Sequence, residues 1–338
     1  MTLAKSTKLK AAVVGCGSIG SLFDEGRRGL DPWTHAGAYA KHPRTILVAG
    51  CDVDARKREN FSKTWGVPTY ANYSDMFVHE RPDIVSVCTW PDSHAEVTIA
   101  AVEAGARAVF CEKPLADSLP NGRKLVQVCE AHNVTLAVNH LRRWDRGHQK
   151  VRDFLREGGL GIPQHVTAYY ANGVANSGSH VADLLRFFFG EVSWVRAFDR
   201  LREKDPDPAL DAYLEMQNEV GCALVGCPHN YCDLFEFDIV GTQGRLAIED
   251  RGSRFRLWRV GSDPQRPSRK ILVEEPAPFP SGLRGMMLGA VENLVRCVIE
   301  QEKLLDTGRD GLAALEVITA VQRSAVAGGD PVSLPLVD

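Results

Sequence analysis

The sequence predicts an α/β protein of two domains. A doubly wound parallel sheet is expected over residues 1–140, and an α+β domain with a large, mainly antiparallel open sheet over residues 141–338. Three observations predict this class. The length of 338 residues suggests two domains at ~150 residues each. The first half alternates short apolar runs with helical stretches, whereas the second half contains strand-like runs with no helices between them.

Five short runs are the predicted strands of the first domain. They are bounded by Gly, Pro or Asp and are continuously apolar rather than alternating, as in a parallel sheet covered on both faces. The predicted strands cover residues 10–15, 45–51, 84–89, 108–111 and 135–138, and the predicted helices cover residues 55–65, 95–104 and 121–132. Strands and helices in this order form βαβ units.

Beyond residue 140 the pattern changes. Helices are predicted at residues 147–157 and 180–189, followed by consecutive strand-like runs from residue 192 to residue 273. Consecutive strands favour an antiparallel sheet. The Pro-rich residues 275–280 are expected to form a loop, and helices at residues 285–302 and 311–327 close the chain, where the closing helix can pack back onto the first domain.

The composition excludes several classes of partner. Forty Lys and Arg against 43 Asp and Glu give a net charge of -3 with no long block of like charges, so we expect neither nucleic acid nor anionic membrane as a partner. No apolar run approaches the ~18 residues of a membrane helix, and the first residues lack the apolar core of a signal peptide. We therefore expect a cytoplasmic protein.

The cysteines fit the same compartment. There are nine, an odd number, and several lie inside apolar runs, which favours reduced thiols. Cys222, Cys227, His229 and Cys232 are close enough in sequence for a metal site to be considered. Their spacing differs from the two-residue spacing typical of zinc sites, and the segment is predicted to form strands, so we expect no metal.

The first strand runs directly into a Gly-rich turn, Gly15-Cys16-Gly17-Ser18-Ile19-Gly20, which matches the dinucleotide fingerprint of a Rossmann domain. In that fingerprint Gly15 permits the tight turn, Gly17 the approach of the backbone to a pyrophosphate, and Gly20 close helix–strand packing. The N–H groups at the start of the following helix, including those of Ser18 and Ile19, would hold the pyrophosphate. A turn without a ligand is the alternative, and the strand context favours the fingerprint.

Asp52, at the end of the second strand, is the expected partner of the adenosine ribose. Its carboxylate can accept hydrogen bonds from the ribose hydroxyls and repel a 2′-phosphate, which favours NAD over NADP. NADP stays open because residues 56–58, Arg-Lys-Arg, could bind a phosphate. The distance from Gly20 to Asp52 is longer than usual, which we attribute to an insertion at residues 24–32 in the first helical crossover. Arg27 and Arg28 of that insertion could touch an anionic substrate, although a solvated loop is favoured.

Polar residues follow the third and fourth predicted strands. Thr89, Trp90 and His94 follow the third, and Glu112, Lys113 and Pro114 follow the fourth. Ligands of open α/β sheets bind at the carboxyl ends of the strands, so these residues are candidates for the coenzyme site. His35 and His94 could equally cap a helix or pack in the core.

These motifs resemble the Gfo/Idh/MocA family of oxidoreductases over nearly the whole chain. The resemblance rests on the Gly-rich turn, the Glu112-Lys113-Pro114 motif, and the segment from Asn176 to Asp183, which is similar to the family's Asp-x-Gly-x-His-x-x-Asp. It implies that Lys113 and His180 lie near the reacting carbon, that Glu112 orients Lys113 or contacts the nicotinamide ribose, and that Pro114 follows a cis peptide. It also implies a homodimer or homotetramer.

The chemistry of these side chains agrees with hydride transfer at a secondary alcohol. A His with a pKa near ~6.5 can exchange the hydroxyl proton, and Lys113 can stabilise the developing alkoxide. Asn176 departs from the family pattern, because it cannot take a proton where many relatives carry Asp. His180 must then act alone, or with Asp183, three residues on and on the same helix face, or not at all. A solvated Asp183 in the first turn is the alternative.

The expected substrate is a sugar, sugar phosphate, nucleotide sugar or cyclic polyol, oxidised or reduced with NAD, with NADP as the alternative. Asn176, Arg142 and Arg143 are candidates for binding it, the last two because they follow the fifth strand where a cleft would open. Two alternatives stay open: an epimerase, glycosidase or imine reductase of the same fold that retains its coenzyme, and a regulator that binds NAD(P) or sugar without turnover.

Overall fold

The computed structural model describes residues 8–26, 30–202, 204–228 and 232–337. They form two compact units: the described residues up to 144 together with residues 285–312, and the described residues from 145 to 284 together with those from 313 onward. Each unit is described by itself. No helix in the described ranges is long and apolar enough to cross a membrane.

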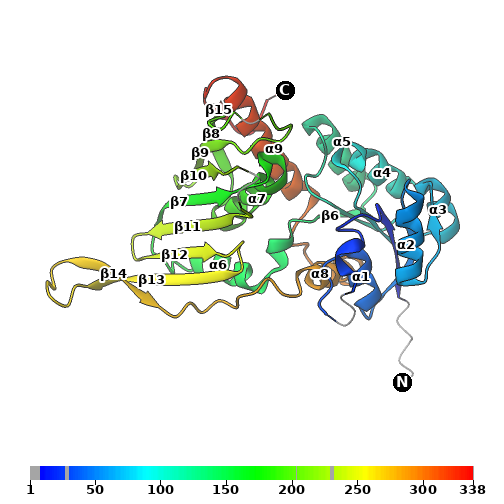
Figure 1. Ribbon diagram of the computed structural model, residues 1–338, viewed down its shortest axis with the longest axis horizontal. Coiled ribbons are helices and arrows are strands. Elements are labelled where there is room, and N and C mark those ends of the chain that lie inside the picture. The colour runs from blue at the N-terminus through cyan, green and yellow to red at the C-terminus, as the bar shows by residue number, and fades with distance from the viewer. Residues whose placement is uncertain (1–7, 27–29, 203, 229–231, 338) are drawn as a thin grey trace. The chain divides into compact units, whose positions relative to one another are not determined.

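The first unit is built on a six-stranded parallel sheet in the order β3-β2-β1-β4-β5-β6 (Figure 1). This is the strand order of a doubly wound dinucleotide-binding fold, and it confirms the predicted parallel sheet. The strands are β1 Leu9–Val14, β2 Thr45–Cys51, β3 Thr69–Tyr70, β4 Ile84–Val87, β5 Ala108–Cys111 and β6 Thr135–Val138. The short β3 was not predicted from the sequence, and β4 ends two residues earlier than expected.

Helices cover both faces of this sheet, as continuously apolar strands require. The helices are α1 His35–Lys41, α2 Ala55–Trp65, α3 Tyr73–Glu80, α4 Pro91–Glu103, α5 Leu119–Ala131 and α8 Met286–Glu300. Alternate residues of β1 enter two separate cores: Ala12 and Val14 pack with α3, α4 and α5, whereas Ala11 and Val13 pack with α1, α2 and α8. Both sheet faces are therefore dry.

The second unit contains a nine-stranded sheet in the order β14-β13-β12-β11-β7-β10-β9-β8-β15. All neighbours pair antiparallel except β7 and β10, which are parallel. The strands are β7 Pro163–Tyr170, β8 Val192–Phe198, β9 Asp211–Met216, β10 Gly221–Gly226, β11 Phe235–Gly241, β12 Gly244–Glu249, β13 Arg254–Ser262, β14 Lys270–Glu275 and β15 Val332–Ser333. The mainly antiparallel sheet confirms the predicted α+β class.

The sequence-based prediction missed β7, which lies between two helices in the chain. This strand is central to the sheet, with β10 on one side and β11 on the other. Its side chains alternate between buried Val166, Ala168 and Tyr170 and more exposed neighbours, so one face of the sheet packs inward and the other does not. The helices of the second unit include α6 Arg146–Arg156 and α7 Gly178–Phe189, and α9 Gly308–Val326 begins in the first unit.

Candidate functional site

The Gly-rich turn leaves β1 at the carboxyl edge of the parallel sheet. Gly15 has a φ of +97°, and a Cβ there would collide with the carbonyl of Cys88 beyond β4. A Cβ on Gly20 would collide with the carbonyl oxygen of Gly15. A Cβ on Gly17 would meet no atom within 4 Å. Gly15 and Gly20 are thus required by the packing of the turn itself, whereas the backbone at Gly17 is open to a ligand.

The same turn presents a row of N–H groups. Within the described ranges, the backbone N–H groups of Gly17, Ser18, Ile19 and Gly20 donate no hydrogen bond, whereas that of Ser21 donates to the Gly17 carbonyl at 2.9 Å. Unsatisfied N–H groups at the first turn of a helix bind phosphate oxygens. The turn therefore fits a dinucleotide pyrophosphate.

Asp52 follows β2 beside this turn and is half-buried. Its Oδ2 accepts a hydrogen bond from the Cys16 N–H and its Oδ1 from the Asp54 N–H, both at 2.9 Å. Arg58 donates through Nη1 to the carbonyl oxygens of Asp52 and Val53, at 2.8 and 2.9 Å. The carboxylate is therefore fixed against the Gly-rich turn, and one of the three basic residues that follow is held by the backbone.

The first helical crossover is interrupted, as the sequence predicted. The turn that starts at Gly17 stops after residue 24, and the N–H groups of His35 and Ala36 then donate to the carbonyls of Ile19 and Gly20, both at 3.1 Å. Through these hydrogen bonds, helix α1 stacks directly on the turn that follows β1, although the inserted segment separates the two in sequence. Arg27 and Arg28 lie outside the described residues.

Asp24 closes the neck of the inserted segment. Its Oδ1 accepts from the Trp33 N–H at 2.8 Å, and its Oδ2 accepts from the N–H and the hydroxyl of Thr34, at 3.1 and 2.5 Å. Thr34 in turn caps α1 by accepting from the Gly37 N–H at 3.0 Å, and a side chain on Gly37 would collide with the Asp24 carboxylate. The position of the first helical residue, His35, is therefore fixed.

Glu112 and Lys113 follow β5 at the same sheet edge. Glu112 is 7% exposed, and its Oε1 lies 3.0 Å from Nε2 of His35 and accepts from the side-chain amide of Asn139. Its Oε2 accepts from the backbone N–H of Lys113 at 3.3 Å. Burial raises the pKa of Glu112, but the hydrogen bond and the electrostatic influence of His35, the hydrogen bond from Asn139 and the charge of Lys113 outweigh it, so the pKa lies below its usual value. The Lys113–Pro114 peptide is cis, which confirms that expectation.

His94 joins the loop after β4 to the loop after β5. The residue is fully buried, with Nδ1 3.1 Å from the Pro114 carbonyl oxygen and Nε2 3.1 Å from that of Thr89. Burial lowers its pKa. Nearby, Thr89 accepts a hydrogen bond from the Ser93 hydroxyl at 2.8 Å, and the indole of Trp90 is 81% exposed. His94 thus holds the loops in place, whereas Trp90 offers an apolar surface at the site.

Arg143 and Arg142 differ in their surroundings. Arg143 is 4% exposed, and its Nη1 donates to the Leu305 carbonyl at 3.0 Å and pairs with Asp310 Oδ1 at 3.1 Å. Its neighbour His140 bonds through N and Nδ1 to Oδ2 of the buried Asp306, at 3.1 and 2.9 Å. This cluster fastens the turn at residues 305–310 to the end of β6. The cluster favours a structural role for Arg143 over the expected binding of a substrate anion. Arg142, in contrast, is half-buried.

In the second unit, a tight turn precedes His180. Residues Gly173–Ser177 form a single π-helical turn, and Gly178 begins α7. The Asp207 carboxylate accepts from the N–H groups of Ala175 and Asn176, at 2.7 and 2.9 Å, and a Cβ on Gly173 would collide with it. The aspartate thus anchors the turn that carries Asn176.

His180 and Asp183 both lie on α7, three residues apart, as predicted. His180 is half-buried and packs edge-on against Phe235, with ring centroids 6.4 Å apart. Asp183 is fully buried, so the alternative of a solvated first-turn acid is wrong. A buried carboxylate requires polar partners, which favours a role in a site.

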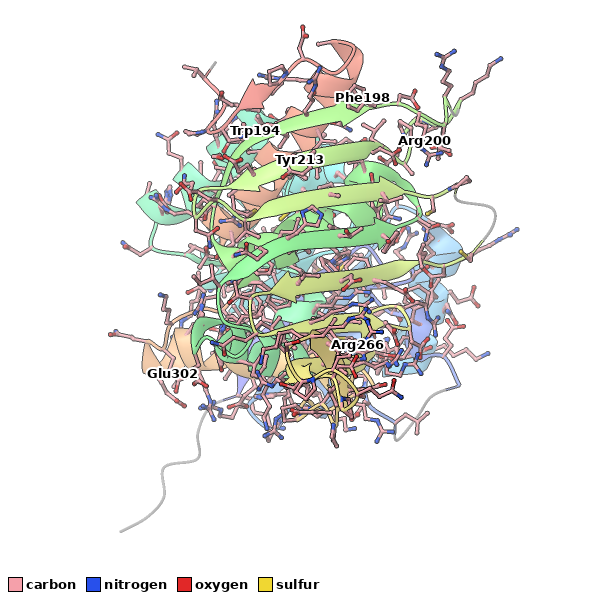
Figure 2. All side chains as sticks on the ribbon, turned by 90° about the vertical axis from the view of Figure 1, so that its left-hand side faces the viewer. Trp194, Phe198, Arg200, Tyr213, Arg266 and Glu302 are labelled. Atoms are coloured by element: carbon pink, nitrogen blue, oxygen red, sulfur yellow. The ribbon has the colours of Figure 1, made fainter. Side chains whose placement is uncertain are left out.

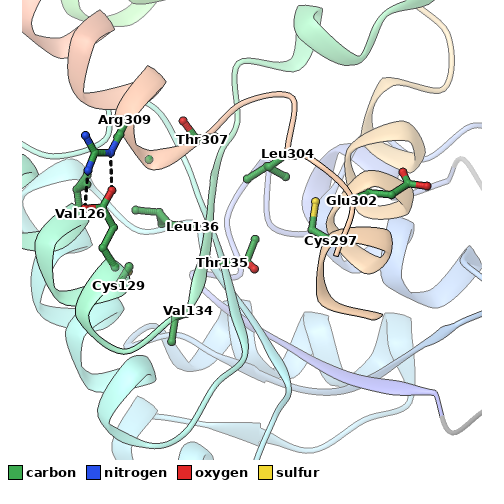
Figure 3. Close-up of a pocket in the computed structure, with 12 residues that line it drawn as sticks. Val126, Cys129, Val134, Thr135, Leu136, Cys297, Glu302, Leu304, Thr307 and Arg309 are labelled. Atoms are coloured by element: carbon green, nitrogen blue, oxygen red, sulfur yellow. Dashed lines mark hydrogen bonds and ion pairs between the residues drawn. The ribbon is translucent and has the colours of Figure 1, made fainter. Parts of the chain in front are cut away.

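A separate hollow of about 390 Å³ lies at the amino-terminal half of β6 (Figure 3). Its lining includes Thr135 and Leu136, and Arg309 at its rim forms a two-point ion pair with Glu130, at 2.6 and 2.9 Å. The Gly-rich turn and Lys113 lie at the opposite, carboxyl edge of the parallel sheet. This hollow is therefore not part of the candidate site.

The cysteine cluster considered for a metal is only partly described, because His229 lies outside the described residues. Cys222 is buried within β10, whereas Cys232 is exposed. All nine cysteines are free thiols.

Comparison with known protein families identifies the chain. A family model described as an oxidoreductase family with an NAD-binding Rossmann fold, Gfo/Idh/MocA, matches residues 9–140, and the C-terminal α/β domain of that family matches residues 173–334. The chain belongs to the Gfo/Idh/MocA oxidoreductase family. It is thus an oxidoreductase whose first unit has the NAD-binding fold.

Several known dehydrogenases resemble this Gfo/Idh/MocA protein at moderate identity. D-apiose dehydrogenase of Paraburkholderia graminis is 27% identical over 95% of this chain and 88% of that protein. Inositol 2-dehydrogenase 3 of Saccharopolyspora erythraea is 27% identical over 60% of this chain and 65% of that protein. The crystal structure of the WlbA dehydrogenase from Bordetella pertussis, in complex with NADH and UDP-GlcNAcA, superposes with a TM-score of 0.78 at 22% identity, covering 98% of this chain and all of that one.

Several residues at the site of this Gfo/Idh/MocA protein gave no sequence signal that we recognised. Asp207 is 31 residues from Asn176 and lies in a loop, so only the fold brings it to the turn. Ser86 lies inside an apolar strand, where the sequence pattern predicts a core position. For His35 a signal exists, because Thr34 is a recognisable N-cap residue directly before it.

Proposed function

We propose that this Gfo/Idh/MocA protein transfers a hydride between NAD and a secondary alcohol or ketone carbon of a sugar, sugar phosphate, nucleotide sugar or cyclic polyol. The observation that carries the proposal is the buried Glu112 carboxylate at the end of β5, which accepts a hydrogen bond from the backbone N–H of the adjacent Lys113. In the sheet, only β4 separates β5 from β1 and its Gly-rich turn. A bound nicotinamide would supply the hydride acceptor or donor, and the chain's own residues supply the rest.

The coenzyme would be held at the carboxyl edge of the first sheet. The N–H groups from Gly17 to Gly20 would hold its pyrophosphate, and Asp52 its adenosine ribose. Thr89 and Trp90 lie in the loop that follows β4. His94 acts by holding that loop. NAD is favoured over NADP, because Asp52 would repel a 2′-phosphate and Arg58 is held by two carbonyls.

Lys113, His180 and Asp183 would do the proton and charge work. The Lys113 ammonium stabilises the alkoxide that forms as the substrate hydroxyl loses its proton. The His180 imidazole exchanges that proton with the substrate oxygen, and Asp183, one helical turn on, would orient or balance the ring. Asn176 and Arg142 would hydrogen-bond substrate hydroxyls or an anionic group.

The named relatives support a carbohydrate or polyol substrate, because they are dehydrogenases of apiose and inositol. Asn176 favours one alternative, a protein that binds coenzyme and sugar without turnover, because the amide cannot replace the carboxylate expected there. Lys113 and His180 are both present, which favours the enzyme.

We further propose a homodimer or homotetramer in the cytoplasm. The unpacked face of the second sheet carries aromatic side chains, including Tyr213 and Phe198, 40% and 46% exposed, and Trp194 lies 5.8 Å from Tyr213 between ring centroids (Figure 2). Aromatic side chains gathered on one face mark interaction surfaces. Nine free thiols suit a reducing compartment.

The test is absorbance in the band of reduced nicotinamide, with NAD or NADP and a panel of polyols, sugars and sugar phosphates. We expect turnover in the wild type, a loss of about 10²- to 10⁴-fold in Lys113→Ala, and no loss in Lys124→Ala, which removes an exposed lysine of α5. Coenzyme binding with no turnover of any substrate in the panel would contradict the proposal and favour the regulator. Coenzyme that copurifies and recycles within one turnover would favour the epimerase or glycosidase alternative.

A further inference from the structure

A chain of buried hydrogen bonds leads from α1 to Glu112. Fully buried His35 lies with Nδ1 2.7 Å from the Ser86 hydroxyl oxygen and Nε2 3.0 Å from Glu112 Oε1. The Ser86 oxygen also lies 2.8 Å from the hydroxyl of Tyr39, a second buried residue of α1. The chain ends at the carboxylate directly before Lys113.

The hydrogen atoms of this chain fit one direction. An ionised carboxylate only accepts, so Nε2 of His35 donates to Glu112. A neutral ring then accepts at Nδ1 from the Ser86 hydroxyl, whose oxygen accepts from Tyr39. If the ring were protonated, its Nδ1–H would donate to Ser86, and either the Ser86 or the Tyr39 hydroxyl hydrogen would then find no acceptor among the described residues. Because a buried hydrogen without an acceptor is costly, the neutral Nε2–H form is favoured.

Glu112 is held on both oxygens. His35 and Asn139 donate to Oε1, and the Lys113 N–H donates to Oε2. A carboxylate with three donors from three segments of the chain cannot rotate without breaking at least one bond. The negative charge beside Lys113 is therefore fixed in place.

We propose that His35 is a positioning residue for the reaction: as a neutral Nε2–H donor, it holds the Glu112 carboxylate as a fixed negative charge beside Lys113. The inference rests on the proposed function, in which Lys113 meets the reacting oxygen. A fixed negative charge beside Lys113 favours its charged ammonium, which stabilisation of a developing alkoxide requires. The hydrogen bonds between Asp24 and Thr34 fix the start of α1 and so set where His35 lies.

A second histidine of the same region gives a matched control. His42 directly follows α1, is buried, and lies with Nε2 2.7 Å from Oε2 of Glu292. This His–Glu pair joins the end of α1 to α8, and the other hydrogen bonds of Glu292 come from Arg44 and Arg296, which are not candidate-site residues. Changes at His42 and at His35 should therefore cost comparable stability but differ in their effect on turnover.

The first experiment reads the ring directly, without substrate or coenzyme. ¹⁵N-histidine NMR of the full chain, with the His35 signals assigned by their loss in His35→Gln, reports which ring nitrogen carries hydrogen. We expect the neutral Nε2–H form, and we expect the His35 signals to move in Glu112→Gln. A protonated ring, the Nδ1–H form, or signals unmoved in Glu112→Gln would overturn the proposal.

The second experiment compares His35→Gln with His35→Leu. A glutamine amide can donate to Glu112 and accept from Ser86, whereas leucine can do neither. We expect kcat to fall about 10- to 100-fold in His35→Leu, with a smaller change in KM for the coenzyme, and to stay near wild type in His35→Gln and His42→Leu. Equal kcat in His35→Leu and wild type, or equal losses in His35→Leu and His42→Leu, would overturn the proposal.

The two experiments separate this inference from the proposed function. If the wild type turns over none of the tested substrates, the proposed function is wrong. The NMR result on the apoprotein does not depend on that outcome. If His35→Leu fails to fold, Ser86→Ala replaces it, since it removes the donor to Nδ1. We then expect a smaller fall in kcat, again without a matching change in coenzyme KM, and no fall would count against the proposal.

Discussion

The backbone N–H of Cys16 donates a hydrogen bond to Oδ2 of Asp52, 36 residues further along the chain, at 2.9 Å. One carboxylate thus fixes the Gly-rich turn to the end of β2. The groups proposed to hold the coenzyme pyrophosphate and its ribose are therefore joined directly, and a change at Asp52 acts on both.

Asp52→Ala should weaken NAD binding by about 10- to 100-fold, because hydrogen bonds to a charged acceptor are lost. NADP binding should fall less or improve, because the repulsion of its 2′-phosphate disappears as well. Titrations that follow the fluorescence of NADH and of NADPH measure the ratio of the two binding affinities. Asp54→Ala is the control, since Asp54 caps α2 by accepting from the Arg56 N–H at 2.8 Å. A coenzyme preference that is the same in both variants would count against the assigned role of Asp52.

Gly17→Ala should abolish coenzyme binding with little change in thermal stability. A Cβ there meets no atom of the protein, yet it stands where the backbone is proposed to approach the pyrophosphate. Gly20→Ala should instead lower the melting temperature, because its Cβ collides with the Gly15 carbonyl. Thermal denaturation beside coenzyme titration separates the two. If Gly17→Ala binds NAD as the wild type does, the pyrophosphate lies elsewhere.

Arg143→Met should destabilise the protein by about 3–5 kcal/mol, because it leaves buried carboxylate charge without its cation. Asp306 is fully buried and Asp310 is paired with Arg143 at 3.1 Å. Arg142→Met should instead raise the substrate KM with a small change in stability. Urea denaturation and steady-state kinetics on both variants are the measurements. A stable Arg143→Met with raised KM would reverse the two roles.

Stability should fall in acid partly through Glu112. Its pKa in the folded chain lies below the usual value, so its contribution to stability is fully present above the unfolded pKa, near 4.5, and is lost as the pH falls through the folded value. Glu112→Gln lacks this contribution, and its stability should therefore fall less steeply below pH 4.5 than that of the wild type. Urea midpoints between pH 6 and pH 3 test this, and parallel curves would contradict it.

Local patterns predicted much of the fold. The predicted strands at 45–51, 108–111 and 135–138 and the helix at 55–65 match the structure, because each is a run of one pattern between clear breakers. Some of the elements that were missed are short or irregular, whereas β7 is a regular strand of eight residues. β3 has two residues, and α1 starts only after the inserted segment. The continuity of α1 with the Gly-rich turn depends on hydrogen bonds between residues with 15 others between them. One of these runs from the Ala36 N–H to the Gly20 carbonyl.

The candidate site divides in the same way. Gly15, Gly17 and Gly20 follow from the chemistry of a turn, and Lys113 and His180 were carried by resemblance. The partners that fix these residues, such as His35 on Glu112 and Asp207 on the turn before His180, come from distant parts of the chain. These side chains meet only when the folded sheet brings the distant segments together, and no local sequence pattern encodes such contacts.

The most direct test of the central claim follows an isotope. A substrate found by the absorbance assay is prepared with deuterium on the carbon that carries the reacting hydroxyl, and the reduced coenzyme is analysed by mass spectrometry. The proposed function predicts that the reduced coenzyme gains the deuterium and that Lys113→Ala slows its transfer. A reduced coenzyme without deuterium, or one labelled only from deuterated solvent, would show that the chain does not move hydride from that carbon.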